Sequence, residues 1–414
     1  MLGLKRGTVE LYPHQAEWDV VAAETVERLR TLFGSVAVDI QHVGSTSVRY
    51  IKAKPIIDIA IAVRSFDDVT PLIPMLEENG IWFRHHIVDG DMLFACGDFE
   101  KDTRTHHIHV VEDGSDEWVN YINFRDYIRN HEDEGKRYDA LKSKLMEEYA
   151  DQRGVYTAHK NEFITRTLSR ARLWRMFGTE VTVTVDRPMG SRHPEHGFEY
   201  PVNYGFIDNI KGGDGEAQDA YVLGVDHPCD SFTGVITGMI LRNDDDEDKL
   251  VVVPHGTVMY QPEIMEKTHF QEQYFDAKYD QLYHKSCGAV VYRRESDGIK
   301  YLLVYQKAGK SWSVPKGHME YSETELDTVK RELYEEARIK PHLIDGFREE
   351  VTYDLKPFYK KVIALYLSEC RDEPQTDGEE IGRFLWASKE EAQNLLGSRY
   401  PADLFDKAEK ILLG

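Results

Sequence analysis

Three glutamates stand close together near the C-terminal end of the chain: Glu332, Glu335 and Glu336. In an α-helix this spacing places the three carboxylates on one face, where they repel one another unless a cation neutralises them. Hard oxygen ligands of this kind suit Mg²⁺ or Mn²⁺. A metal held there can bridge phosphate oxygens and activate a water molecule for in-line attack; the alternative is a solvated acidic helix face.

The residues around these glutamates have a characteristic order. Gly317 is followed after five residues by Glu323, and after seven more by Arg331 and the glutamate cluster. This order resembles the Nudix box, with Arg338 where the family has a glycine that turns the chain after the helix. The resemblance implies that Glu332, Glu335 and Glu336 bind metal and that Gly317 allows a close backbone approach to it. We expect Glu323 and Arg331, about two turns apart, to pair and fix the helix against the preceding loop.

The resemblance extends beyond the box. Cys287-Gly-Ala-Val-Val-Tyr, Trp312-Ser-Val-Pro-Lys316-Gly-His318 and Glu380 resemble the asymmetric diadenosine-tetraphosphate hydrolases, which release ATP and AMP. The likeness implies that one of the three helix glutamates or Glu380 is the general base, and that Lys316 and His318 contact phosphates. Tyr359 and Phe358 are candidates for stacking a base, with a core or rim position as the alternative.

A second acidic motif lies in the middle of the chain. Asp214, Glu216 and Asp219 stand in a turn that opens a predicted strand, with Tyr204 upstream and Glu247-Asp248-Lys249 downstream. Such a turn alone is ordinary turn chemistry. Together and in this order, the residues resemble family I soluble inorganic pyrophosphatases. The resemblance implies that Asp214, Glu216, Asp219 and Asp248 (or Glu247) hold metal and that Lys249 and Tyr204 bind phosphate. Phe275 stands where that family has a phosphate-binding lysine.

A third motif lies near the N-terminus. Gly44-Ser45 precedes a predicted strand that carries Asp58, as in nucleotidyltransferases, where such a turn holds triphosphate and strand carboxylates hold Mg²⁺. The segment resembles the GrpB family, which has that fold. The second carboxylate of the nucleotidyltransferase pattern is absent because Ala60 occupies its position. His107 and His109 point to the same side of a predicted strand and are candidates for completing a metal or phosphate site. An inactive nucleotide-binding or packing fold is the favoured alternative.

The elements that position these motifs predict three domains. Residues 1–172 combine strands with a helical tail and read as a nucleotidyltransferase-like α/β domain. Residues 173–281 contain short β-branched runs, which indicate a small pyrophosphatase-like β-barrel closed by a helix over 263–279. Residues 282–414 alternate strands and helices, as in a Nudix α/β/α sandwich. A helix is also predicted over 67–79.

Composition restricts the partners of this 414-residue chain. The formal net charge is -22, so extended binding to long nucleic acid is disfavoured, whereas a small phosphate ligand bridged by metal is compatible. No apolar run is long enough to span a membrane, and the four cysteines form no CxxC pair, which favours reduced thiols and the cytoplasm. The oligomeric state stays open.

Three functions follow from these motifs. The first is asymmetric hydrolysis of diadenosine tetraphosphate, with inorganic pyrophosphatase activity as a further possibility for the middle domain. The second is hydrolysis of another phosphoanhydride, such as (p)ppGpp, a nucleoside triphosphate or an RNA 5′ end. The third is a nucleotide sensor, in which the first two domains bind a small nucleotide without turnover.

Overall fold

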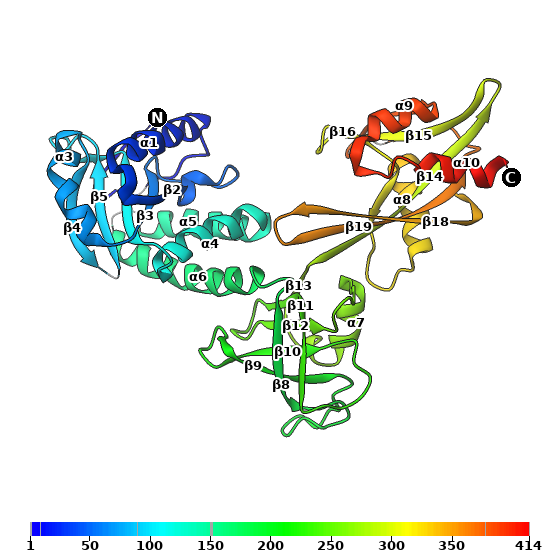
Figure 1. Ribbon diagram of the computed structural model, residues 1–414, viewed down its shortest axis with the longest axis horizontal. Coiled ribbons are helices and arrows are strands. Elements are labelled where there is room, and N and C mark those ends of the chain that lie inside the picture. The colour runs from blue at the N-terminus through cyan, green and yellow to red at the C-terminus, as the bar shows by residue number, and fades with distance from the viewer. Residues whose placement is uncertain (1, 9, 89, 150–151, 377, 414) are drawn as a thin grey trace. The chain divides into compact units, whose positions relative to one another are not determined.

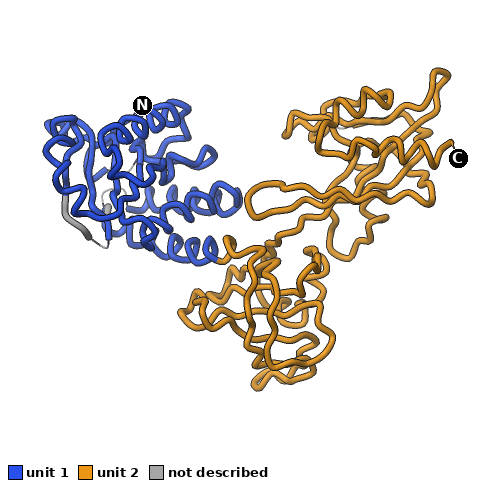
Figure 2. Tube along the Cα trace, viewed as in Figure 1, with its two compact units in different colours: residues 1–172 blue, residues 173–414 orange. Residues whose placement is uncertain are grey.

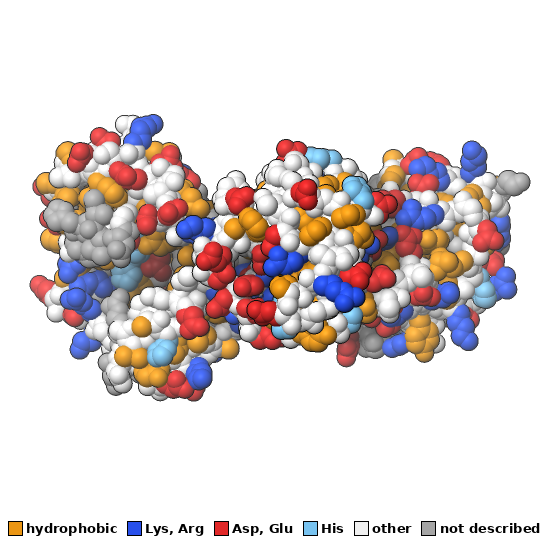
Figure 3. Space-filling view, turned by 90° about the horizontal axis from the view of Figure 1, so that it is seen from below, with side chains coloured by type: hydrophobic (Ala, Val, Ile, Leu, Met, Phe, Trp, Pro, Cys, Tyr) orange, Lys and Arg blue, Asp and Glu red, His pale blue; other side chains and the backbone are white. Residues whose placement is uncertain are grey.

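The computed structural model describes residues 2–8, 10–88, 90–149, 152–376 and 378–413. Contacts divide the chain into two compact units, Met1–Arg172 and Leu173–Gly414 (Figures 1 and 2). No helix in the described ranges is both long and apolar enough to cross a membrane. Acidic side chains are spread over the visible face of the molecule in Figure 3, as the net charge of -22 requires.

The first unit is built on a five-stranded sheet. Its strand order is β2 (Ala37–Val43), β3 (Ile57–Val63), β7 (His106–Glu112), β5 (Asp91–Cys96) and β4 (Trp82–Val88), and β3 and β7 run parallel. A short pair, β1 (Leu4–Lys5) and β6 (Thr103–Arg104), lies beside it. Helix α1 (Ala16–Phe33) packs into the main core through Trp18 and Leu29, which meet Ile59, Ile61 and Ile108 of the sheet.

Helices cover the rest of this unit. The helical tail comprises α4 (Asp116–Asn130), α5 (Glu132–Tyr149) and α6 (Arg153–Trp174), and α4 contacts β3 and β7. The prediction of one continuous helix over 67–79 is wrong. The segment divides into α2 (Phe66–Val69), a 3₁₀ turn (Thr70–Leu72) and α3 (Ile73–Glu78), because Pro71 and Pro74 have no amide hydrogen to donate.

The second unit begins with a closed barrel. Its strands β12 (Lys249–Val253), β10 (Ala217–Val222), β9 (Asn203–Lys211), β8 (Glu180–Arg187) and β11 (Ser231–Arg242) follow one another, and β12 also pairs with β11 to close the ring. The predicted β-barrel is therefore confirmed. Its closing helix α7 (Gln261–Glu272) is shorter than predicted, since residues after Glu272 form strand β13 (Ala277–Gln281), which pairs with β11.

The second unit ends in a sheet covered by helices on both faces (Figure 1). The sheet contains β14 (Tyr283–Glu295), β15 (Gly298–Gln306), β16 (Ser311–Ser313), β17 (Lys316–His318), β18 (His342–Lys356), β19 (Tyr359–Glu369) and β20 (Ile381–Ala387). The helices are α8 (Glu325–Ala337), α9 (Lys389–Leu396) and α10 (Leu404–Leu413). Alternate residues of β14 face two cores: Cys287 packs with Leu333 of α8, and Val290 packs with Phe405 of α10. This is the predicted α/β/α sandwich.

Candidate active site and the other predicted motifs

Helix α8 carries the glutamate cluster and has well-defined ends. The Thr324 hydroxyl caps its N-terminus by accepting a hydrogen bond from the amide of Asp327, and the Asp327 carboxylate accepts one from the Thr324 amide. The helix ends at Arg338, whose φ of 55° lies in the left-handed region that favours glycine. Arg338 therefore adopts the backbone turn for which the Nudix box uses glycine.

The carboxylates of α8 lie in unequal environments. Glu332 and Glu336 are buried, with 8% and 6% exposure, whereas Glu335 is exposed. Burial raises the pKa of Glu336 to about 7, and the charges of Glu332 and Glu380 act in the same direction. Burial also raises the pKa of Glu332, assisted by the charges of Glu335 and Glu380 and opposed by Arg331. The charges of the exposed Glu335 and of Glu380 therefore act on the two buried carboxylates.

Arg331 holds this cluster to the loop before it. Its guanidinium forms a bidentate pair with Glu323, with N–O distances of 2.7 and 3.0 Å, and donates to the carbonyl of His318 at 2.7 Å. The same side chain contacts Glu332 at 2.6 Å and Glu335 at 3.1 Å. These hydrogen bonds lower the pKa of Glu323 to about 2, so Glu323 is ionised at neutral pH.

Two glycines bring the backbone against this cluster. A side chain on Gly317 would collide with the carboxylate of Glu332, so the glycine lets this carboxylate lie directly against the backbone of β17. The next backbone amide towards the N-terminus, that of Lys316, donates to Glu336 at 3.0 Å. A side chain on Gly288 of β14 would collide with Pro315 and Lys316. The strand β17 is therefore pressed between β14 and α8.

A cavity of about 950 Å³ opens in front of the cluster. Its lining includes the carboxylates of Glu332, Glu335, Glu336 and Glu380 together with the basic side chains of Lys316, His318 and Lys361. The Nζ of Lys361 lies 2.9 Å from Nε2 of His318, and burial lowers the pKa of Lys361 to about 8, with Lys316 adding repulsion. Lys361 could not be predicted from the Nudix box, because it lies outside that motif. The sequence indicates its position only as a lysine that precedes an apolar run, residues 362–367.

The two aromatic candidates for base stacking do not line this cavity. Tyr359 is only 3% exposed, and its hydroxyl donates to Asp280 at 2.7 Å. Phe358 packs edge-on against Trp174, with ring centroids 4.9 Å apart. Both residues therefore pack against residues 174–280 rather than facing the glutamates. The aromatic side chain that lines the cavity is Tyr353 of β18.

The donor set suits a hard divalent cation, although it is not arranged as a chelate. Among the described residues, no group of three or more His, Cys, Asp or Glu side chains is placed to hold an ion. The Arg331 guanidinium instead supplies the positive charge beside Glu332 and Glu335. Two buried carboxylates with raised pKa values lack sufficient compensating charge, and Mg²⁺ or Mn²⁺ would supply it.

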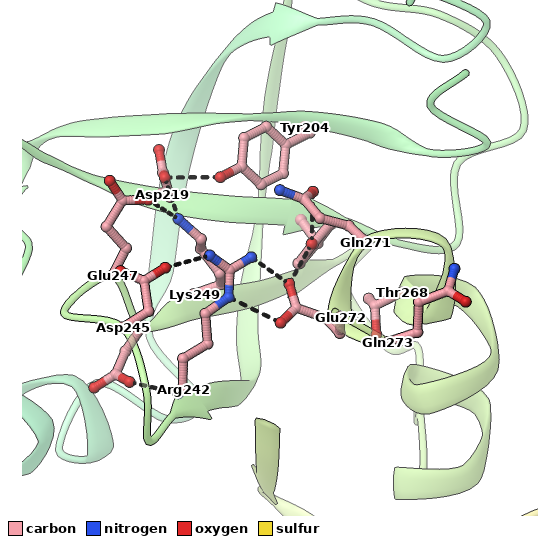
Figure 4. A network of polar contacts seen from close by, with 12 residues as sticks. Tyr204, Asp219, Arg242, Asp245, Glu247, Lys249, Thr268, Gln271, Glu272 and Gln273 are labelled. Atoms are coloured by element: carbon pink, nitrogen blue, oxygen red, sulfur yellow. Dashed lines mark hydrogen bonds and ion pairs between the residues drawn. The ribbon is translucent and has the colours of Figure 1, made fainter. Parts of the chain in front are cut away.

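The barrel brings together only part of its predicted motif (Figure 4). The Oδ2 atom of Asp219 accepts hydrogen bonds from Tyr204 at 2.7 Å and from Lys249 at 2.5 Å. Lys249 also pairs with Glu247 at 2.7 Å and is 1% exposed. Its ammonium is therefore already shared between two carboxylates.

The other predicted metal ligands of the barrel make local contacts. The Asp214 carboxylate accepts from the amide of Glu216 at 3.0 Å, within the exposed turn. Asp248 accepts from the backbone amide of Arg242 at 2.9 Å. At the position of the expected lysine, the ring of Phe275 instead carries the Arg242 guanidinium 3.6 Å from its centroid.

A buried ion pair fixes this part of the barrel. Arg242 donates to both carboxylate oxygens of Glu272, at 2.7 and 3.0 Å, and contacts Asp245 at 3.0 Å (Figure 4). Arg242 and Glu272 are 2% and 3% exposed. The pair joins strand β11 to helix α7.

The predicted residues of the first unit meet at the end of β3. Gly44 has a φ of 67°, and a side chain there would collide with the carboxylate of Asp58. Asp58 contacts Nδ1 of His107 at 3.2 Å. Burial alone would raise the pKa of Asp58, but the hydrogen bond to His107 and nearby positive charges lower it. His109 instead pairs with Asp91 at 2.5 Å, a residue that the sequence reasoning did not include.

Comparison with known proteins identifies two regions of the chain. Residues 8–170 match the GrpB protein family, and residues 282–407 match the NUDIX domain. The glutamate-rich protein GrpB of Alkalihalophilus pseudofirmus is 37% identical over 172 residues, which are 41% of this chain and 99% of that protein.

The C-terminal region has relatives of known activity. The asymmetrical bis(5′-nucleosyl)-tetraphosphatase of Sus scrofa is 35% identical over 100 residues, which are 21% of this chain and 66% of that protein. A solved structure of a C. elegans Ap4A hydrolase binary complex is 27% identical and covers 32% of this chain and 98% of its own, with a TM-score of 0.30. The NUDIX domain and these relatives support the assignment of the chain as a nucleotide phosphoanhydride hydrolase. The chain belongs to the GrpB family through its N-terminal region and carries a NUDIX domain in its C-terminal region.

Proposed function

We propose that the NUDIX domain hydrolyses dinucleoside polyphosphates asymmetrically and releases ATP and AMP from diadenosine tetraphosphate. The observation that carries the proposal is a single cavity lined both by the glutamates of α8 with Glu380 and by Lys316, His318 and Lys361. Such a lining suits a polyphosphate, because the basic side chains and a carboxylate-held cation would both compensate its charge. The similarity to asymmetrical bis(5′-nucleosyl)-tetraphosphatases supports this substrate over other phosphoanhydrides.

The residues of this chain have distinct parts in the reaction. A divalent cation, when bound, polarises phosphate oxygens and acidifies a water molecule. Lys316, His318 and Lys361 hold the phosphates, while Arg331 keeps the helix in register with the glycine strand. A carboxylate, either Glu380 or one of the helix glutamates, takes a proton from the attacking water. The water oxygen forms a new bond to phosphorus, and the bridging P–O bond breaks, so the second product leaves as a phosphate anion.

Product analysis tests the substrate directly. The full chain is incubated with Mg²⁺ and diadenosine tetraphosphate, inorganic pyrophosphate or ppGpp in parallel, and the products are separated by ion exchange. ATP and AMP from the dinucleotide, absent with Glu335→Gln and retained with the exposed-surface variant Glu266→Gln, are the expected result. Cleavage of ppGpp with no cleavage of the dinucleotide would replace the substrate but keep the catalytic helix.

The barrel offers a second, separable activity. The contacts of Asp219 with Tyr204 and Lys249 match three of the residues implied by the pyrophosphatase resemblance. Pyrophosphate hydrolysis should then be lost in Asp219→Asn and retained in Glu335→Gln. If Asp219→Asn leaves all hydrolysis unchanged, the barrel binds or packs without turnover, as in the sensor hypothesis.

A further inference from the structure

The first unit contains a cavity of about 260 Å³ whose lining is strongly cationic. Six basic side chains line it: Lys5, Arg6, Lys54, Arg104, Lys142 and Lys160. Among the described residues that line it, Asp58 is the one acidic side chain. In a chain with a net charge of -22, this concentration of positive charge differs from the rest of the molecule. The cavity is called the lysine pocket below.

The four lysines come from separate parts of the unit. Lys5 belongs to β1, Lys54 precedes β3, Lys142 comes from α5 and Lys160 comes from α6. The ring of Tyr156 lies between two of them, with its centroid 4.8 Å from the Nζ of Lys54 and 5.9 Å from that of Lys160. The tertiary fold therefore gathers like charges, at an electrostatic cost that an anionic ligand would remove.

Lys142 shows this cost most clearly. It is 2% exposed, donates to the carbonyl of Lys52, and lies 3.4 Å from the hydroxyl of Ser45. Its ammonium pairs with the carboxylate of Asp139 at a distance of 3.9 Å. Burial lowers the pKa of Lys142 to about 7; Asp139 opposes the shift, and Lys160, Lys52 and Lys54 add to it. A buried ammonium with so little compensating charge is rare unless a ligand completes its environment.

A second cavity continues from the lysine pocket. It has a volume of about 470 Å³ and shares four lining residues with the first: Ser45, Asp58, Tyr138 and Lys160. The rest of its lining includes the apolar surfaces of Tyr121, Phe124, Ile164 and Leu168 and the carboxylates of Asp91 and Glu117. A ligand can therefore place anionic groups among the lysines and an uncharged organic part beside the aromatic rings.

We infer that the lysine pocket binds an oligophosphate, either free or as the phosphate part of a small organic ester. The hydroxyl of Ser45 and the ammonium groups of Lys142, Lys54 and Lys160 provide donors suited to phosphate oxygens. Asp58 is paired with His107, and Ala60 stands where a second carboxylate would be needed for metal-assisted transfer. The pocket is therefore a binding site rather than a transferase centre.

Hydrogen exchange on the full chain locates this binding independently of the NUDIX domain. The ligands are inorganic tripolyphosphate and ATP, both in EDTA. Binding should protect peptides that cover residues 42–58 and 136–149. Lys142→Met should raise the ligand concentration needed for half-maximal protection roughly tenfold or more, since a charged hydrogen bond is lost. Lys144→Met is the matched control, because Lys144 lies on the same helix but is exposed and pairs with Glu148.

Three further results would support or overturn phosphate binding in the lysine pocket. If Lys142→Met does not fold, Lys160→Met, which removes a partly exposed lysine, must show the same loss of protection. Tighter binding of ATP than of tripolyphosphate would show that the second cavity receives the organic part. Protection by neither ligand, or equal protection in Lys142→Met and Lys144→Met, would overturn the inference without affecting the proposed hydrolase activity.

Discussion

Replacing Glu336 with glutamine tests whether the carboxylate helix is built for a cation. Burial raises the pKa of Glu336 to about 7, from an ordinary value of 4.5. The folded protein therefore binds this proton more tightly than the unfolded chain does. The resulting stability is present below pH about 4.5 and is lost as pH rises to about 7. At about 1.4 kcal/mol per pH unit, the ionised side chain costs roughly 3 kcal/mol at pH 8 and under about 1 kcal/mol at pH 5.

Glutamine keeps the acceptor for the Lys316 amide but carries no charge to bury. Without metal, Glu336→Gln should therefore be more stable than the unmodified chain by roughly 3 kcal/mol at pH 8, with a much smaller gain at pH 5. The measurement is urea unfolding in EDTA at both pH values, followed by tryptophan fluorescence. Glu335→Gln is the control: its side chain is 55% exposed, so no comparable gain is expected.

Magnesium should reverse the order. With Mg²⁺ at pH 8, the unmodified chain should gain stability in proportion to its metal occupancy, and Glu336→Gln should gain less. A glutamine variant that is no more stable than the unmodified chain at pH 8 in EDTA would refute the argument that Glu336 is buried at an electrostatic cost. An equal gain from Mg²⁺ in both proteins would refute its role as a ligand.

Three further substitutions test separate parts of the structure. Gly317→Ala places a methyl group against the Glu332 carboxylate, so kcat should fall roughly 100-fold while the far-UV circular dichroism is retained; unchanged kcat would show that the helix does not need this close approach. Lys361→Met should raise KM for a polyphosphate substrate roughly tenfold. Lys360→Met changes the exposed neighbouring residue and should leave KM unchanged. Equal effects of the two substitutions would show that Lys361 does not bind phosphate. Glu272→Gln leaves the buried Arg242 charge without its carboxylate and should destabilise the barrel to denaturant by about 3–5 kcal/mol. The control Glu266→Gln, exposed on the same helix, should change stability little. If Glu272→Gln is also neutral, Asp245 alone satisfies Arg242.

Helix α8 of the NUDIX domain could be predicted from the sequence because residues close together in the chain determine it. Glu323 and Arg331 stand eight residues apart, and helical periodicity with the loop before it suffices to bring them together. The same applies to the left-handed end at Arg338, which the family pattern places. These features depend on neighbours in the chain rather than on the tertiary fold.

Other features depend on distant partners and escaped prediction. Strands β5, β9 and β13 carry Asp91, Asp208 and Asp280, so they lack the regular apolar alternation that marks a strand. Tyr359 looked available for a base, but its hydroxyl is bound by Asp280, which no spacing rule connects to it. The lysine pocket likewise required α5 and α6 to fold back beside β3, and only the three-dimensional structure shows that Lys142 and Lys160 line the same cavity.

The junction between β13 and β14 has a consequence for how the chain can be cut. Strand β13 ends at Gln281 in the barrel sheet and β14 begins at Tyr283 in the NUDIX sheet, so Leu282 alone connects them. Leu282 is 7% exposed; its amide donates to Thr237 at 2.8 Å, and its carbonyl accepts from Lys360 at 2.7 Å. A protease needs several extended, accessible residues to engage a peptide bond, and this junction offers none. Limited digestion of the second unit should therefore spare the junction, and barrel and hydrolase should persist as one fragment through cleavage of their outer loops.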